Sequence, residues 1–229
     1  MTNIIWIAVG QVAPRRLFVL LSGIALVLAA LSVYGNYLAY VPSHGIFTGN
    51  AFHHVFTLDG ERRVPTLFSC VLILINAALL TLIACVAIAK QHRYGAHWLI
   101  LAAVFFYLAL DEGSKIHEEA LDFLIPILGI EFLHFWVIPA SLIMLCFAAL
   151  YWPFLRALPA ATRTLFMASA LVYLGGALGM EALGGIYAEL HGKDNFPYLL
   201  LANLEEFAEM MGMILFGYTL LRHLQGMRA

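Results

Sequence analysis

The chain has 229 residues, of which 63% are hydrophobic and only 11% are charged. This composition excludes an ordinary water-soluble domain, because apolar runs recur that are long enough to cross a bilayer at about 20 residues each. The formal net charge of −2 gives no indication of a nucleic-acid partner. The sequence therefore predicts an integral membrane protein.

Six apolar segments follow one another along the chain. They are continuous and lack the period-two alternation of barrel strands, so we predict that they are α-helices. The third apolar run is the shortest, which indicates that its membrane part continues through Asp111 and Glu112. We expect an all-α bundle of about six transmembrane helices over residues 17–40, 66–89, 97–110 with its polar continuation, 132–153, 164–188 and 198–221.

The connections between these segments are too short to hold a soluble domain, so residues 1–229 are predicted to form a single membrane domain. Outer loops are expected at about 41–65, 119–131 and 189–197. The three cysteines lie in apolar segments without CxxC spacing, and we interpret them as small core residues.

Basic residues predict the orientation. Eight of the 12 lysines and arginines fall on one side of this topology and four on the other, which places both termini in the cytoplasm. All 14 carboxylates then lie toward the outer side. We expect a bacterial inner-membrane protein whose site faces the outer side.

Three of the apolar segments carry carboxylates at one level. Asp111 and Glu181 each lie 18 residues from a cytoplasmic arginine on the same segment, and Glu205 lies 17 residues from its own. All three therefore stand roughly 25 to 27 Å up their helices, near the outer edge of the hydrocarbon core. On the last segment Glu205, Glu206 and Glu209 fall within about 100° of one another and share a face.

Carboxylates inside apolar helices are costly, so we interpret them first as functional. Crowded carboxylates repel one another and burial disfavours their charged form, so they need protons, cationic partners or a metal. Carboxylate sites with one or two histidines suit iron, manganese or zinc, and we expect one or two such divalent ions. Neither Glu112-x-x-Lys115 nor Glu206-x-x-Glu209 supplies the Glu-x-x-His pair of ferritin-like sites. The candidate metal ligands are Asp111, Glu112, His117, Glu181, Glu205, Glu206 and Glu209, with His134 as an alternative to His117.

Protonation is the other solution to the same electrostatic problem. Acidic residues at one level can relay protons or bind a coupling cation in a transporter. Five glycines around Glu181 would let the fifth helix move, or would simply allow close helix contact of the GxxxG kind, which is the more common role: Gly175, Gly176, Gly179, Gly184 and Gly185.

Two short motifs carry a resemblance. Asp111-Glu112 is followed after four residues by His117-Glu118, and Leu204-Glu205-Glu206 is followed after two residues by Glu209. In these motifs the chain resembles a loose group of uncharacterised bacterial polytopic membrane proteins. The resemblance implies a membrane fold and carries no activity.

The sequence thus predicts a membrane-embedded carboxylate and histidine metal site. As an enzyme, such a protein would use the metal to activate water or oxygen against a lipid-soluble substrate at the outer leaflet. A proton- or cation-coupled secondary transporter is the alternative, and an accessory subunit of a larger membrane complex is a third. Whether the chain is an enzyme is left open by the sequence.

Overall fold

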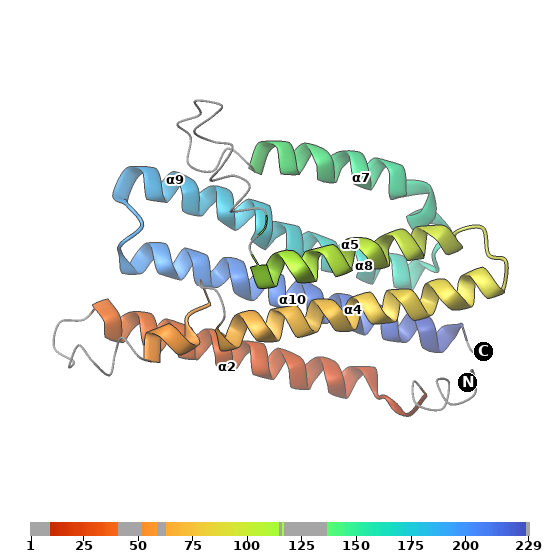
Figure 1. Ribbon diagram of the computed structural model, residues 1–229, viewed down its shortest axis with the longest axis horizontal. Helices are drawn as coiled ribbons and strands as arrows, with labels where there is room; N and C mark the ends of the chain where they lie inside the picture. The colour runs from red at the N-terminus through yellow and green to blue at the C-terminus, as the bar shows by residue number, and fades with distance from the viewer. Residues whose placement is uncertain (1–9, 41–51, 59–62, 115, 117–136, 228–229) are drawn as a thin grey trace.

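The computed structural model describes residues 10–40, 52–58, 63–114, 116 and 137–227, and all regular elements among them are helical (Figure 1). The predicted all-α class is therefore confirmed for this part of the chain. The elements are α2 (Pro14–Tyr40), α4 (Val64–Ala89), α5 (Gly95–Ser114), α7 (Val137–Ala157), α8 (Ala160–Leu174), the π-helix η1 (Gly175–Met180), α9 (Glu181–His191) and α10 (Phe196–Gly226).

Where the structure describes them, helix boundaries agree with the predicted segments to within about five residues; the predicted start of the fourth segment at residue 132 lies outside the described residues. The expected polar continuation of the third segment is helical, since α5 runs through Asp111 and Glu112 to Ser114. The connection before α10 is shorter than predicted, because only residues 192–195 separate α9 from α10. Asn195 caps α10 by accepting a hydrogen bond of 3.0 Å from the Tyr198 backbone N–H. The predicted loop at 119–131 lies outside the described residues, as does most of the loop at 41–65.

Five helical segments in the described part of the chain are long and apolar enough to cross a membrane: Pro14–Ala39, Val64–Ala89, Gly95–Ser114, Val137–Ala157 and the continuous rod Ala160–His191. The described residues therefore have the character of a membrane protein. Helix α10 does not belong to this set although it has 31 residues, because three glutamates interrupt its apolar run. The total of six spans stays a prediction.

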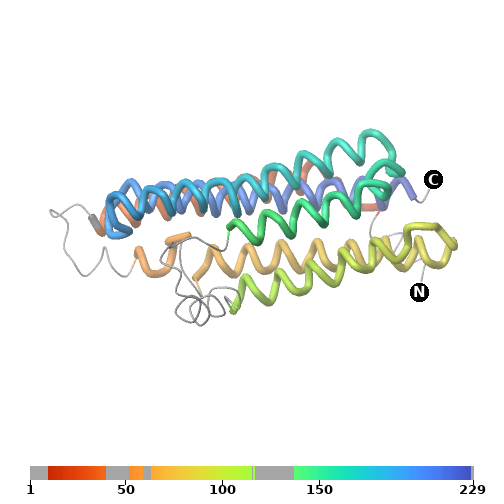
Figure 2. The backbone as a smooth tube through the Cα atoms, turned by 90° about the horizontal axis from the view of Figure 1, so that it is seen from above, coloured from red at the N-terminus to blue at the C-terminus, as the bar shows by residue number. Residues whose placement is uncertain are grey.

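Helix α10 is the centre of the bundle. It contacts α2, α4 and α8 along its length and η1 and α9 near its beginning. Figure 2 shows α4 and α5 side by side on one side of α10, and this pair shares the most extensive helix contact among the described elements. Because α10 carries three of the candidate carboxylates, each helix packed on it faces the candidate site or the core beneath it.

The beginning of α2 and the end of α10 lie at one end of the bundle, which we call the terminal end. Gln225 Nε2 donates to the Val12 carbonyl at 2.9 Å, and Lys90 Nζ donates to the Met227 carbonyl at 2.8 Å. The described arginines apart from Arg63 gather at this end, near the ends of their helices or, for Arg93, in the connection between α4 and α5. The ends of the two helices thus lie together, while the cytoplasmic placement of this end stays a prediction.

Two apolar clusters fill the bundle below the carboxylates. One surrounds Trp98, Phe154 and Leu220 near the terminal end, and the other surrounds Leu72, Met210 and Met213 further along. Met210 is only 1% exposed and directly follows Glu209 on α10. The carboxylates therefore begin where the apolar core ends, at the opposite end of the bundle, which we call the carboxylate end.

Candidate functional site

The carboxylates of the candidate site come from three separate parts of the fold. Helix α5 contributes Asp111 and Glu112 near its last turn, Glu181 is the first residue of α9, and α10 contributes the rest. These six carboxylates are partly buried: Asp111, Glu112, Glu181, Glu205, Glu206 and Glu209. The exposed acids Glu189 and Asp194, by contrast, are solvated in the way expected of loop charges.

Glu181 and Glu205 are hydrogen-bonded to each other through their side chains. A charged carboxylate is only an acceptor, so a hydrogen bond between two carboxyl groups requires a proton on one of them. Glu206 and Glu209 lie within electrostatic range of Glu205 and disfavour a second negative charge there. A hydrogen bond of this kind would hold one proton between α9 and α10.

Glu209 is hydrogen-bonded to the side chain of Tyr173 on α8. It also lies within electrostatic range of Glu112 and Glu181, so it connects the α5 carboxylates to the Glu181–Glu205 pair. Sequence reasoning missed Tyr173. The available signal was its position ten residues along an apolar segment from Arg163, because a hydroxyl at such a depth needs a hydrogen-bond partner.

The contacts of Cys70 on α4 show where Glu112 lies. Its Sγ lies 3.9 Å from the Ala109 carbonyl, one turn before Gly113, and it is within electrostatic range of Glu112. A Cβ on Gly113 would lie 3.5 Å from the same sulfur, which is ordinary contact. Glu112 is thus held near the interface of α4 with α5. Asp111, Glu112, Glu181 and Glu206 all have further interactions, so none of them is without a partner.

Two glycines let the helices of the site approach closely. A Cβ on Gly176 would lie 2.8 Å from the Glu205 carbonyl oxygen and 3.1 Å from Glu209 Cγ. A Cβ on Gly212 would lie 2.7 Å from the backbone nitrogen of Tyr173. The distances of 2.8 Å at Gly176 and 2.7 Å at Gly212 are too short for a side chain. The rod of α8, η1 and α9 can therefore contact α10 this closely only with glycine at these positions. The expected close helix contact therefore falls on Gly176, whereas Gly175 and Gly179 meet no neighbour within 4 Å.

The π-helix η1 determines which way Glu181 faces. Eight residues separate Tyr173 from Glu181, and in a regular α-helix this spacing would place the two side chains about 80° apart. A π segment contains the equivalent of one extra residue, which reduces the difference to about 20°. Tyr173 and Glu181 can therefore both reach carboxylates of α10.

The described residues contain no group of three or more His, Cys, Asp or Glu side chains arranged to hold a metal ion. Glu181 is engaged with Glu205, and Glu209 with Tyr173, so these oxygen atoms do not converge on a common centre. His117 and His134, the histidines predicted as ligands, lie outside the described residues. The described part of the chain gives the predicted metal centre no support.

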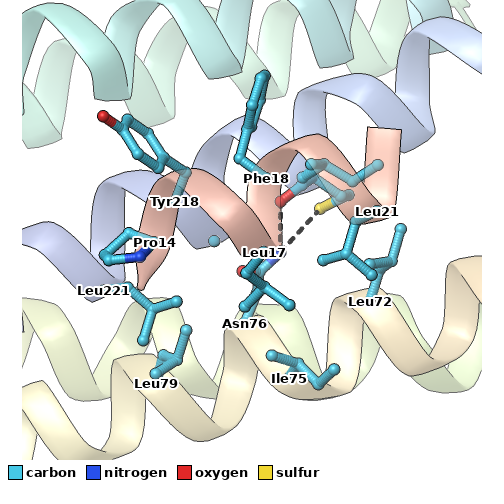
Figure 3. A pocket seen from close by; sticks show the side chains of 13 residues that line it. Pro14, Leu17, Phe18, Leu21, Leu72, Ile75, Asn76, Leu79, Tyr218 and Leu221 are labelled. Atoms are coloured by element: carbon cyan, nitrogen blue, oxygen red, sulfur yellow. Dashed lines mark hydrogen bonds between the residues drawn. The ribbon is translucent and has the colours of Figure 1, made fainter. Parts of the chain in front are cut away.

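A small cavity of about 20 Å³ lies away from the carboxylates, between α2, α4 and α10 (Figure 3). Its lining is mostly apolar, and Pro14 and Leu221 place it toward the terminal end. Asn76 lines it as well; this side chain is 1% exposed, and its Nδ2 donates to the Met213 carbonyl at 2.9 Å. Since none of the candidate carboxylates borders it, the cavity is separate from the site.

Comparison with curated proteins and with solved structures finds no match to the chain. A family model does match, and it covers residues 11–224, which include every described helix except the last residues of α10. The chain therefore belongs to the family described as a domain of unknown function, DUF8692.

Proposed function

We propose that the carboxylate end binds and releases protons as the coupling site of a secondary membrane transporter. The observation that carries the proposal is the hydrogen bond between the Glu181 and Glu205 side chains. Two carboxyls in contact bind one proton tightly, because losing it leaves two charges side by side in a poorly solvated site. Such a pair can take up and release a proton as its surroundings change.

The neighbouring groups extend the pair across the bundle. Glu209 lies within electrostatic range of Glu181 and of Glu112, and it is hydrogen-bonded to Tyr173. Three helical rods thus contribute groups that can hold or pass a proton. Relays of acidic residues inside apolar helices are a common feature of transporters and pumps.

The first test uses infrared spectroscopy of the purified protein in detergent, titrated with acid. The wild type is expected to show a protonated-carboxyl band that persists at neutral pH, and Glu205→Gln is expected to lose it. Glutamine can still donate to Glu181, so the contact is kept while the shared proton is removed. Glu189→Gln, which replaces an exposed acid of α9, is the matched control and should leave the band unchanged.

The coupling itself is tested in proteoliposomes that contain a pH-sensitive dye. A panel of amino acids, sugars and organic cations is added outside under an imposed pH gradient. At least one solute should move protons with the wild type and none with Glu205→Gln. A neutral-pH band that survives in Glu205→Gln, or solute-driven proton movement that the variant keeps, would contradict the proposal.

A metal-dependent enzyme acting on a lipid-soluble substrate is the second candidate. One feature of the sequence favours it: Glu131 and His134 have the spacing of the Glu-x-x-His pairs that bind metals in helical bundles. Both residues of that pair lie outside the described part of the chain.

Metal content separates the two candidates. The protein is purified without chelator and its metals are measured by plasma mass spectrometry, beside the double variant Glu206→Gln, Glu209→Gln. The transporter proposal expects well under one iron, manganese or zinc ion per chain in both proteins. About one or two ions per chain in the wild type, lost in the variant, would replace it with the metal-dependent enzyme.

A further inference from the structure

The π-helix η1 separates the two residues through which the α8–α9 rod reaches the carboxylates of α10. Tyr173 lies two residues before η1, and Glu181 follows it directly. π-helices are rare, occur mostly as single-turn insertions in α-helices, and are often found at functional sites. The extra residue costs stability locally, so a regular α-helical form of the same six residues is a close competitor.

The surroundings of η1 differ between its two sides. On the α10 side Gly176 is buried and held against the Glu205 carbonyl. On the opposite side Gly175 and Gly179 are exposed, and a Cβ at either would meet nothing within 4 Å. One side of η1 is therefore packed against α10, and the side that carries Gly175 and Gly179 has open space beside it.

Helix α9 has the features needed to turn about its own axis. Its fully buried residues are all small, namely Gly184, Gly185 and Ala188, so no large side chain of α9 is enclosed in the core. Gly192, which follows α9, has φ of +78°, a backbone conformation that glycine adopts readily, and it begins a connection of only four residues. A rotation of α9 can thus be absorbed at both of its ends.

We propose that η1 is the two-state element that opens the proton site, an inference that rests on the proposed proton-coupled function. In the π form Glu181 faces Glu205 and the two share a proton. In the α form the one-residue difference turns Glu181 by about 100° away from α10. The shared proton then passes to solvent, and both carboxyls become charged and separate.

The groups that face Glu181 determine the direction of the pH response. On α10 these are Glu205 and Glu209, with Glu206 beside them, while Tyr173 faces Glu209 from α8. Asp111 and Glu112 on α5 lie within electrostatic range of Tyr173. Helix α7 also contacts η1, and residues 137–150 of it carry no charge. The groups named here on α10 and α5 are acidic, so deprotonation is expected to drive Glu181 away from them and to favour the α form.

The test measures the distance between spin labels on either side of η1. Labels are attached at Leu171 on α8 and Leu190 on α9, which are 76% and 73% exposed, in a chain whose three native cysteines are replaced. At acidic pH a single distance is expected, and a second population should appear as the pH rises. Labels at Leu171 and Leu145, which is 67% exposed on α7, do not span η1 and should give one distance throughout.

A deletion of Leu178 provides the second variant. Removing one residue from a π segment restores a regular α-helix without changing the direction of the residues that follow, so Glu181 stays opposite Glu205. This variant should keep the protonated-carboxyl band and show a single label distance at every pH.

The possible failures are distinguishable. A single, pH-independent distance in the otherwise wild-type chain, with the Glu205-dependent infrared band intact, would overturn the two-state element and leave the proton site standing. Loss of the band in the Leu178 deletion would also overturn the two-state element, because removing one residue would then not keep Glu181 opposite Glu205. A band that Glu205→Gln leaves unchanged would overturn the proton site itself, whatever the distances show.

Discussion

Replacing Gly212 by alanine is expected to push α8 away from α10 and to lower the free energy of unfolding by about 3 kcal/mol. An added Cβ would lie 2.7 Å from the Tyr173 backbone nitrogen and 2.8 Å from its Cα. Backbone atoms inside a long helix cannot turn aside as a flexible side chain can, so the two helices must separate. The midpoint of thermal unfolding in detergent should fall by roughly 5 to 10 °C.

Gly23→Ala is the matched control for this variant. Gly23 lies inside α2, and a Cβ there would meet nothing within 4 Å. Alanine also stabilises an exposed helix interior relative to glycine, so this control should melt at or slightly above the wild-type temperature. If both variants melt alike, the crossing of α8 with α10 is not as tight as the distances indicate.

Replacing Gly176 by leucine is expected to abolish the shared proton between α9 and α10. The new side chain would begin 2.8 Å from the Glu205 carbonyl and 3.1 Å from Glu209 Cγ. It would therefore lift η1 from α10 and carry Glu181 out of reach of Glu205. The protonated-carboxyl band at neutral pH should disappear, and the unfolding free energy should fall by about 1 to 3 kcal/mol.

Gly175→Leu and Gly179→Leu test whether the effect belongs to this one contact. Both positions lie in the same π-helix, are exposed and have no neighbour within 4 Å of an added Cβ. Leucine there would point away from the bundle, so the band and the melting midpoint should stay close to the wild-type values. Equal loss in all three variants would mean that the π-helix tolerates no side chains, and that the Gly176 contact is not what holds the site.

The helices could be predicted because their signal is local. A bilayer-spanning run needs about 20 apolar residues, and such runs can be read without knowing what packs on them. The common height of Glu181 and Glu205 also followed from counting residues along each helix, and the structure brings these two side chains into a hydrogen bond.

The partners of each carboxylate could not be predicted, because they depend on rotation about the helix axes. The sequence contains no sign that Gly175–Met180 is a π-helix, yet that segment changes the direction of Glu181 by about the angle of one residue. For the same reason the sequence did not predict that Tyr173 contacts Glu209 at the place where α8 packs on Gly212. The metal ion stays a prediction, because the types and heights of the residues do not tell whether their oxygen atoms converge on one point or pair with each other.

The packing of the first helix on the last has a consequence for biosynthesis. Helix α2 has α10 as its main partner among the described helices, yet roughly 155 residues of chain separate them. At ordinary translation rates α2 waits in the membrane for roughly ten to thirty seconds before α10 emerges from the ribosome. α2 can wait alone because its surface is apolar, whereas α10 carries three glutamates that lipid does not solvate. The last helix should therefore enter the membrane as the other helices close around it, and a chain truncated before Phe196 should leave α2 exposed to quality-control proteases.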